Sequence, residues 1–213
     1  MIFKVCLEAS PCNKLNKVLK ELEKDKVNYE VCREPMYNWS HRNDLIKLWS
    51  NVITMGPSQG HSFYFLVNSI FNKYNNNLYY ADLQSRIKKK TVVFERSLYT
   101  DFYVVAMFLY SRNQLNYNEL KLIEQIFKYF ISKIPLVNLF IRVRVKHCLD
   151  EQKYIKGVPV TPEILSSYDE ILDEVFSGKD NYISLDWEDN QTPEEITDKI
   201  KLIIKSRSKN FYR

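Results

Sequence analysis

Five short apolar runs, separated by helix-patterned segments, constrain the fold of this 213-residue chain more than any other feature. In chain order they occupy residues 2–8, 28–33, 90–96, 139–145 and 182–187. Several are nearly continuous Val, Ile and Phe, which is typical of strands buried on both faces of a parallel sheet. The alternation predicts a helix-rich α/β domain of three layers with a five-stranded parallel sheet.

Helical periodicity occupies the gaps between runs in the second half of the chain. Apolar residues recur three and four positions apart over residues 117–133 and again over residues 161–176. Pro162 suits the first turn of the latter segment. Thr192, followed by Pro193 and two glutamates, has the residue types that cap and begin a further helix. Long helices are therefore expected to follow the third, fourth and fifth strands.

The composition is that of a globular chain, with 45% hydrophobic and 14% aromatic residues. We expect a single domain over residues 1–213 that folds without metal or disulfide help. The longest apolar runs are shorter than the roughly 18 residues that a membrane span needs, so no membrane partner is expected. The N-terminus lacks the pattern of a secretory signal, which predicts an intracellular protein.

The cysteines and histidines form no metal-binding pattern. No CxxC spacing occurs, and the three histidines do not complete a zinc motif. The sequence therefore predicts no metal site and no cofactor. Inside a cell the thiols are expected to be reduced, although in an oxidised assembly they could form inter-subunit disulfides. The four cysteines are Cys6, Cys12, Cys32 and Cys148.

Two basic clusters stand out against a formal net charge of +5, at residues 86–91 and 199–213. Either could contact nucleic acid or serve as a nuclear-import address. No glycine-aromatic interleaving or recognition motif accompanies them, so solvated surface is the favoured interpretation. Nucleic acid is not expected as a partner.

Two short motifs resemble those of the deoxynucleoside kinases. "REPMYNWS", after the second run, is similar to the family's Glu-Pro-x-x-x-Trp motif, and "FERSLYTDFYVVAMFLY" resembles its Glu-Arg-Ser motif with the helix that follows. The resemblance implies a P-loop-kinase-like fold. It places Glu34 on the catalytic base, Trp39 in the substrate pocket, and Glu95 and Arg96 on the sugar-binding and phosphate-stabilising positions. "VPVTPEILSSYDEIL" and "NYISLDWED" are similar to the segment after the family's lid and to its last strand.

The phosphate-binding loop departs from the family pattern. A loop of the type GxxxxGK[ST] needs glycines so that backbone amides converge on the phosphates, a lysine for their charge and a hydroxyl for magnesium. In register from Glu8, the glycine positions hold Ala9, Cys12 and Lys14, the lysine position Leu15 and the hydroxyl position Asn16. The sequence therefore predicts no residues that bind a triphosphate there.

The lid and the nucleobase helix depart as well. "HCLDEQKYIKGVPV" contains no arginine, only Lys153 and Lys156, and a lysine is a point charge without the bidentate guanidinium fork. "GHSFYFLVNSIF" resembles the helix whose glutamine pairs with the base, but Leu66 occupies that position and cannot form a hydrogen bond. Both binding and chemistry are expected to be weakened.

These departures predict that the motif residues Glu34, Glu95 and Arg96 are relics without a catalytic role. A buried Glu34–Arg96 ion pair would persist for structural reasons, because removing one partner strands the other charge at a cost of about 3 to 5 kcal/mol. Trp39 and Trp49 are expected to be core residues. On this interpretation the chain is not an enzyme.

The favoured functional hypothesis is a self-assembling structural protein. Fifteen tyrosines and twelve phenylalanines exceed the needs of a core of this size, and tyrosine packs well against partners. In general similarity and composition the chain resembles viral occlusion-body proteins, the polyhedrins of insect nudiviruses. That resemblance implies a matrix in the host nucleus that encases virions and dissolves at alkaline pH, with the chain itself and the virion surface as partners.

Two alternatives remain open. The first is a divergent deoxynucleoside kinase with a rebuilt donor site, which retention of the Glu-Arg-Ser and Glu-Pro motifs favours. The second is a pseudokinase that binds a partner, for example through the basic C-terminal segment.

Overall fold

The computed structural model describes residues 2–10, 13–34, 61–82, 90–134, 136–145, 154–155, 158–159 and 162–211. Several positions that the sequence singled out lie outside these ranges, and their predicted roles stay predictions. They are Cys12, Trp39, Trp49, Cys148, Lys153 and Lys156.

The described residues form an all-parallel sheet of five strands in the order β2-β3-β1-β4-β7. The strands are β1 (Phe3–Glu8), β2 (Tyr29–Cys32), β3 (Thr91–Glu95), β4 (Leu139–Val145) and β7 (Tyr182–Trp187). They coincide with the five predicted runs to within a residue or so at each end. The α/β class and the parallel sheet are therefore confirmed, because near-continuous Val, Ile and Phe require cover on both faces.

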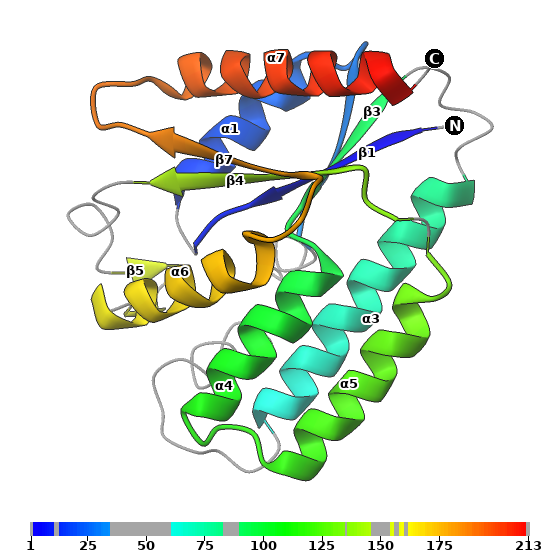
Figure 1. Ribbon diagram of the computed structural model, residues 1–213, viewed down its shortest axis with the longest axis vertical. Helices are drawn as coiled ribbons and strands as arrows, with labels where there is room; N and C mark the ends of the chain where they lie inside the picture. The colour runs from blue at the N-terminus through cyan, green and yellow to red at the C-terminus, as the bar shows by residue number, and fades with distance from the viewer. Residues whose placement is uncertain are drawn as a thin grey trace.

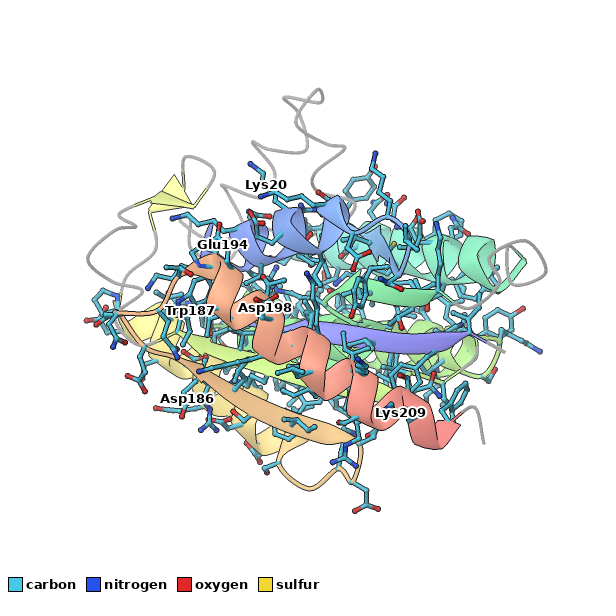
Figure 2. The ribbon with its side chains drawn as sticks, turned by 90° about the horizontal axis from the view of Figure 1, so that it is seen from above. Lys20, Asp186, Trp187, Glu194, Asp198 and Lys209 are labelled. Carbon is cyan, nitrogen blue, oxygen red and sulfur yellow. The ribbon has the colours of Figure 1, made fainter. Side chains whose placement is uncertain are left out.

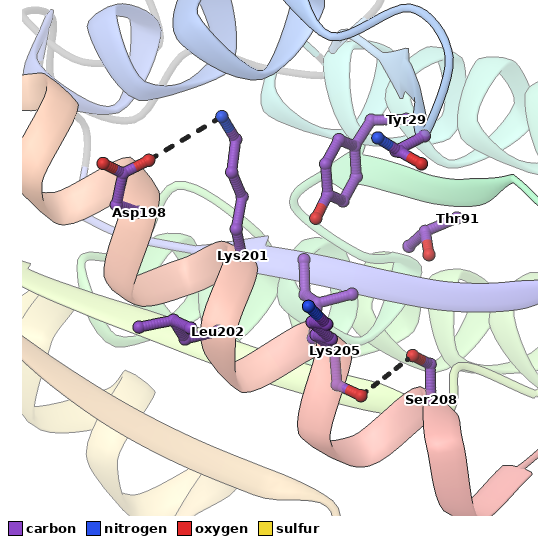
Figure 3. A pocket seen from close by; sticks show the side chains of 9 residues that line it. Tyr29, Thr91, Asp198, Lys201, Leu202, Lys205 and Ser208 are labelled. Atoms are coloured by element: carbon purple, nitrogen blue, oxygen red, sulfur yellow. Dashed lines mark hydrogen bonds and ion pairs between the residues drawn. The ribbon is translucent and has the colours of Figure 1, made fainter.

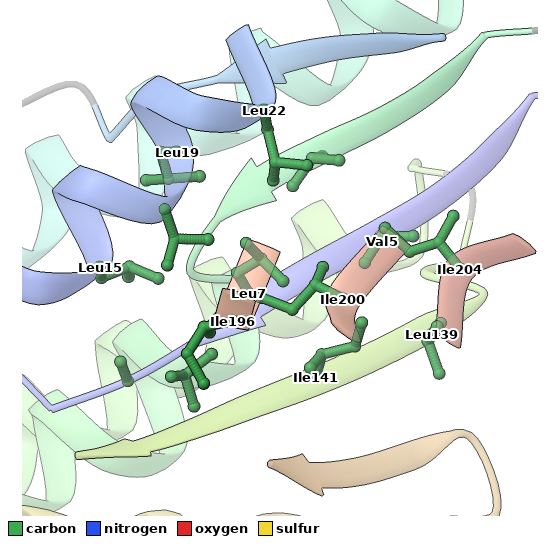
Figure 4. Packing of buried hydrophobic residues seen from close by; sticks show 14 of the residues in the cluster. Val5, Leu7, Leu15, Leu19, Leu22, Leu139, Ile141, Ile196, Ile200 and Ile204 are labelled. Atoms are coloured by element: carbon green, nitrogen blue, oxygen red, sulfur yellow. The ribbon is translucent and has the colours of Figure 1, made fainter. Parts of the chain in front are cut away.

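One face of the sheet is covered by α1 (Asn13–Lys24) and α7 (Pro193–Phe211), which lie together above the strands in Figures 1 and 2. Alternate residues of β1 and β4 point to this face and meet leucines of α1 and isoleucines of α7 (Figure 4). Leu15, Ile196 and Ile200 are at most 1% exposed in this cluster.

The opposite face is covered by α6 (Pro162–Phe176) and by a π-helical segment, η3 (Thr100–Ala106), that continues into α4 (Met107–Ser111). Beyond η3, the long helices α3 (His61–Asp82) and α5 (Tyr117–Ile131) pack side by side and extend away from the sheet (Figure 1). The three-layer arrangement is confirmed, with α3 and α5 added below it.

The predicted helix starts are explained by capping. Thr192 Oγ1 accepts from the Glu195 amide at 3.2 Å, and the Glu195 carboxylate accepts from the Thr192 amide at 2.8 Å. Asn116 and Glu119 form the same reciprocal box before α5. Such pairs satisfy amides that have no partner inside the helix.

The segment "NKYNNNLYY", residues 72–80, suggests a loop by composition but lies within α3. Two of its asparagines bond back to the helix, Asn72 to the Asn68 carbonyl at 2.8 Å and Asn77 to the Lys73 carbonyl at 2.9 Å. Tyr74 stacks on Phe130 of α5 with ring centroids 4.1 Å apart. Tertiary packing therefore overrides the low helix propensity of asparagine.

A short antiparallel pair, β5 (Tyr154–Ile155) and β6 (Val158–Pro159), was not predicted from the sequence. Of the helices that the structure describes, none has the length and apolarity to cross a membrane.

Candidate active site

Three carboxylates meet where β1, β2 and β3 end. Glu8 and Glu95 are the last residues of β1 and β3, and Glu34 lies two residues beyond β2. All three are at most 9% exposed. Because the strands are parallel, their carboxyl ends lie at one edge of the sheet, where α/β proteins bind ligands.

Arg96 makes the turn from β3 into the following helix. It is a non-glycine residue with φ of 57°, a conformation that side chains other than Gly adopt only under constraint. Its amide donates to the Leu7 carbonyl at 2.9 Å and its Nε to the Ala9 carbonyl at 3.2 Å. These bonds to the chain around the end of β1 hold the guanidinium over the carboxyl edge of the sheet.

Glu34 is held by two cations. Its Oε2 accepts from Arg96 Nη1 at 2.7 Å, and its Oε1 lies 3.1 Å from Lys73 Nζ. The Glu34 amide donates to Glu95 Oε2 at 2.9 Å. The predicted Glu34–Arg96 ion pair is therefore present, and Lys73 is a third member that the sequence analysis missed.

Behind Glu34, the buried pair of Lys73 and Asp101 joins α3 to η3. Lys73 Nζ lies 2.6 Å from Asp101 Oδ1, and Ser69 donates to Asp101 Oδ2 at 3.0 Å. Lys73 and Ser69 lie one helical turn apart on α3, so they present donors on one face. π-Helical turns occur frequently at functional sites, and η3 supplies Asp101 here.

Glu8, the last residue of β1, is buried at the same edge of the sheet. It accepts from the Ser97 amide at 3.0 Å and from the Thr100 hydroxyl at 2.5 Å. Both partners belong to the first turn after Arg96. The Glu8 carboxylate therefore fixes the start of the helix that carries Asp101.

Burial controls the electrostatics of this cluster. Desolvation raises the pKa of Glu8, Glu95 and Asp101, against the opposing effect of the nearby cations. Desolvation by itself would lower the pKa of Lys73, but the charges of Asp101 and Glu34 outweigh it and the pKa is raised. Four carboxyl groups share two cations, so the buried cluster has an excess of acidic groups.

The first turn of α1 contains the positions where the phosphate-loop pattern requires a lysine and a hydroxyl. Leu15, in the lysine position, is buried in the core, and Asn16, in the hydroxyl position, accepts from Arg33 at 3.2 Å. Lys14 Nζ lies 5.5 Å from the Trp187 ring centre and 3.8 Å from Asp189. These three side chains of α1 are engaged in protein contacts, which do not fit the phosphate-binding role.

A second polar network adjoins this connection. Ser10 donates to Asp169 of α6, and the guanidinium of Arg142 on β4 pairs with Asp169 and Asp173. Arg144 Nη2 lies 2.6 Å from Asp173. Arg142 is 1% exposed, so this network ties α6 to the sheet from inside the protein.

The remaining predicted positions that the structure describes, Leu66, Cys6 and Cys32, are buried in the protein core. Leu66 is fully buried among apolar side chains of α3, η3 and α5. Cys6 and Cys32 are buried thiols that form no disulfide with another described residue, and the inter-subunit disulfide prediction for the four cysteines remains a prediction. Within the described ranges, no group of three or more His, Cys, Asp or Glu side chains is placed to hold a metal ion.

The sequence offers a partial signal for Lys73 and Asp101, although it does not show that they meet. Lys73 follows Leu66 by seven residues, two helical turns further along the same face. Asp101 lies five residues after Arg96 of the Glu-Arg-Ser motif, in a segment that is otherwise largely apolar. A buried lysine requires a buried acid, which is the signal that links the two.

A family model of deoxynucleoside kinases matches residues 16–168, well over half of the chain. The match includes Glu34, Lys73, Glu95, Arg96 and Asp101. A search of curated proteins found no match.

The family match overturns two predictions made above. The predicted non-enzymatic occlusion-body protein is wrong, because the chain matches a family of kinases and nothing supports the polyhedrin identity. The prediction that the chain is not an enzyme is wrong for the same reason. That prediction relied on the degenerate phosphate-binding loop and gave too little weight to the motif residues Glu34, Glu95 and Arg96. By its sequence, this chain belongs to the deoxynucleoside kinase family.

Proposed function

We propose that the protein is a nucleoside kinase that transfers a phosphoryl group to a hydroxyl of a deoxynucleoside. The observation that carries the proposal is the buried convergence of Glu34, Arg96 and Lys73 at the carboxyl edge of the sheet. Family membership supports it independently.

Glu34 is the proposed general base. Two cations within 3.1 Å stabilise its charged form, and a carboxylate is the form that takes a proton from an attacking hydroxyl. For the hydroxyl to reach Glu34, one of the two ion pairs must lengthen. Arg96 is the partner that can then face the negative charge of the transferring group, because its Nε remains anchored on the Ala9 carbonyl.

The nucleobase of the acceptor nucleoside is proposed to contact three polar side chains, Lys73, Asp101 and Ser69. Leu66 offers no hydrogen bond, so the base edge has to be recognised by groups further along α3. A lysine and a carboxylate side by side provide a donor and an acceptor in a water-poor site.

The site for the phosphate donor lacks the residues of the family's phosphate-binding loop. Leu15, Asn16 and Lys14 are committed to the core, to Arg33 and to Trp187 with Asp189. The donor phosphates therefore have to be held by groups other than these three side chains.

The test uses the purified full chain with ATP and Mg²⁺ as probe donor, and thymidine, deoxycytidine, deoxyadenosine and deoxyguanosine as acceptors. We expect a nucleoside monophosphate product with at least one acceptor, lost in Glu34→Gln. Glu30→Gln is the matched control, because Glu30 pairs with Lys90 at 3.9 Å away from the site. Binding of a deoxynucleoside without product from any nucleoside triphosphate donor would refute the proposal.

A further inference from the structure

A second polar groove lies at the other end of the sheet from the candidate active site. It has a volume of about 600 Å³ and runs between α7 and the start of β2 and β3 (Figure 3). Asn28, Tyr29 and Thr91 line one wall, and Lys201, Lys205 and Ser208 line the other. Thr91 and Glu95 are the two ends of β3, so the groove and the candidate site are about 13 Å apart along that strand.

Unused hydrogen-bond donors face this groove. Thr91 is 8% exposed, and its hydroxyl has no hydrogen-bond partner among the described residues. The Tyr29 hydroxyl is also without a described partner, and in Figure 3 it lies on the side of the ring that faces α7. Two free hydroxyls on one wall are available to a ligand.

The opposite wall is cationic. Lys201 is balanced by Asp198, whose carboxylate lies 3.8 Å away and whose side chain is 75% exposed. Within the part of the chain that the structure describes, Lys205 has no ion-pair partner. The two ammonium groups lie one helical turn apart on α7, so both can reach one anion.

We propose that this groove binds the phosphate of a nucleotide. Lysine ammonium groups and hydroxyls are the donors that a phosphate monoester accepts. The volume is far larger than a bare phosphate needs and lies in the range of small-molecule sites. The Tyr29 ring with Leu202 and Ile204 provides apolar surface for the nucleoside, while Asn28 and Ser208 provide acceptor oxygens.

This inference goes beyond the proposed function, because the groove shares no residue with the cluster around Glu34. It also gives a role to part of the C-terminal basic segment, which the candidate active site does not use. Figure 2 shows that α7, with Asp198 and Lys209 along it, lies on the outside of the sheet, where a nucleotide can enter.

The first test measures binding of thymidine 5′-monophosphate by calorimetry at low salt, with inorganic phosphate and thymidine as comparison probes. We expect the double variant Lys201→Gln/Lys205→Gln to raise the Kd for the nucleotide at least tenfold. Lys199→Gln/Lys209→Gln removes the same charge from exposed positions outside the lining and should change the Kd less than twofold. Equal losses in the two doubles would overturn the site.

The second test needs no variant that alters the fold. Lysine acetylation of the wild-type chain is followed by mass spectrometry with and without the nucleotide. Protection of Lys201 and Lys205, but not of Lys199 and Lys209, supports the groove. No protection, or equal protection by inorganic phosphate, would overturn the nucleotide proposal. Measuring phosphoryl transfer on the same wild-type preparation separates the two sites, because protection of Lys201 and Lys205 without any transfer would support the groove while refuting the proposed function.

Discussion

Glu34 Oε2 and Arg96 Nη1 lie 2.7 Å apart in a buried contact that joins the end of β2 to the end of β3. Lys73 approaches the other oxygen of Glu34, so a single carboxylate is shared by two cations from different elements. This contact braces the carboxyl edge of the sheet, and it also places a carboxylate base beside a guanidinium at that edge. The tests that follow separate these roles.

Replacing Glu34 by glutamine should affect catalysis and stability together. Loss of a positioned general base costs about 10²- to 10⁴-fold in rate. Arg96 loses its described ion-pair partner while Lys73 keeps Asp101, and the loss should cost about 3 to 5 kcal/mol of unfolding free energy. Steady-state kinetics and urea denaturation measure the two effects. In the exposed control Glu30→Gln, the change in stability should stay below about 1 kcal/mol. Unchanged stability in Glu34→Gln would show that the pair is not buried as described.

Lys73→Met should be strongly destabilising, because it leaves the buried Asp101 without its cation, while Glu34 keeps Arg96. We expect a loss of about 3 to 5 kcal/mol. In the double variant Lys73→Met/Asp101→Asn, the loss should be smaller than the sum of the single losses by about 1 to 3 kcal/mol. Chemical denaturation of the four proteins completes the cycle. Simple additivity would mean that the two side chains do not interact.

Leu15→Lys restores the lysine of a phosphate-binding loop at the position where the family pattern has it. Because Leu15 is 1% exposed in the core, we expect a loss of about 3 kcal/mol or more and no gain in ATP binding. Lys17→Leu, at an exposed position two residues later, should change stability by no more than about 0.5 kcal/mol. Tighter ATP binding by Leu15→Lys would show that the connection can still form the cradle.

Relative to wild type, Glu8→Gln should be more favourable to stability at neutral pH than at acid pH. Burial raises the pKa of Glu8 in the folded state, so its stabilising contribution is present below the ordinary carboxyl pKa and is lost as pH rises through the folded value. Glutamine keeps an acceptor for the Ser97 amide without the charge. Thermal unfolding from pH 4 to 8 should therefore show a flatter pH profile in Glu8→Gln. A steeper profile would contradict the raised pKa.

Lys4 offers an alkaline test. Its ammonium is buried without a hydrogen-bond partner among the described residues, and burial lowers its pKa to about 8. Between about 8 and the ordinary 10.5, the unfolded chain binds more protons, so the Lys4 contribution to stability rises with pH across that window. Lys4→Met should remove this rise and stabilise the protein at pH 7 by about 1 to 3 kcal/mol. Lys20→Met, at an exposed position, is the control and should retain the rise. A Lys4→Met profile identical to wild type would contradict the assignment.

Much of the fold was readable from residue patterns, because each pattern acts locally. Five short β-rich runs, several of them nearly continuous Val, Ile and Phe, predicted the five strands of the sheet, and the Thr192 and Asn116 positions show why capping residues mark helix starts. The exception was the asparagine-rich end of α3, where helical structure depends on Tyr74 stacking against Phe130 of another helix.

Periodicity and short motifs, which reflect local structure, predicted the sheet, the helices α5, α6 and α7, and the positions of Glu34, Glu95 and Arg96 near strand ends. Tertiary structure decided the partners. Lys73 and Asp101 are 28 residues apart, and only the packing of α3 on η3 places them 2.6 Å from one another. The groove at Lys205 depends in the same way on α7 lying beside β2 and β3, and no one-dimensional pattern specifies which surfaces distant segments present to each other.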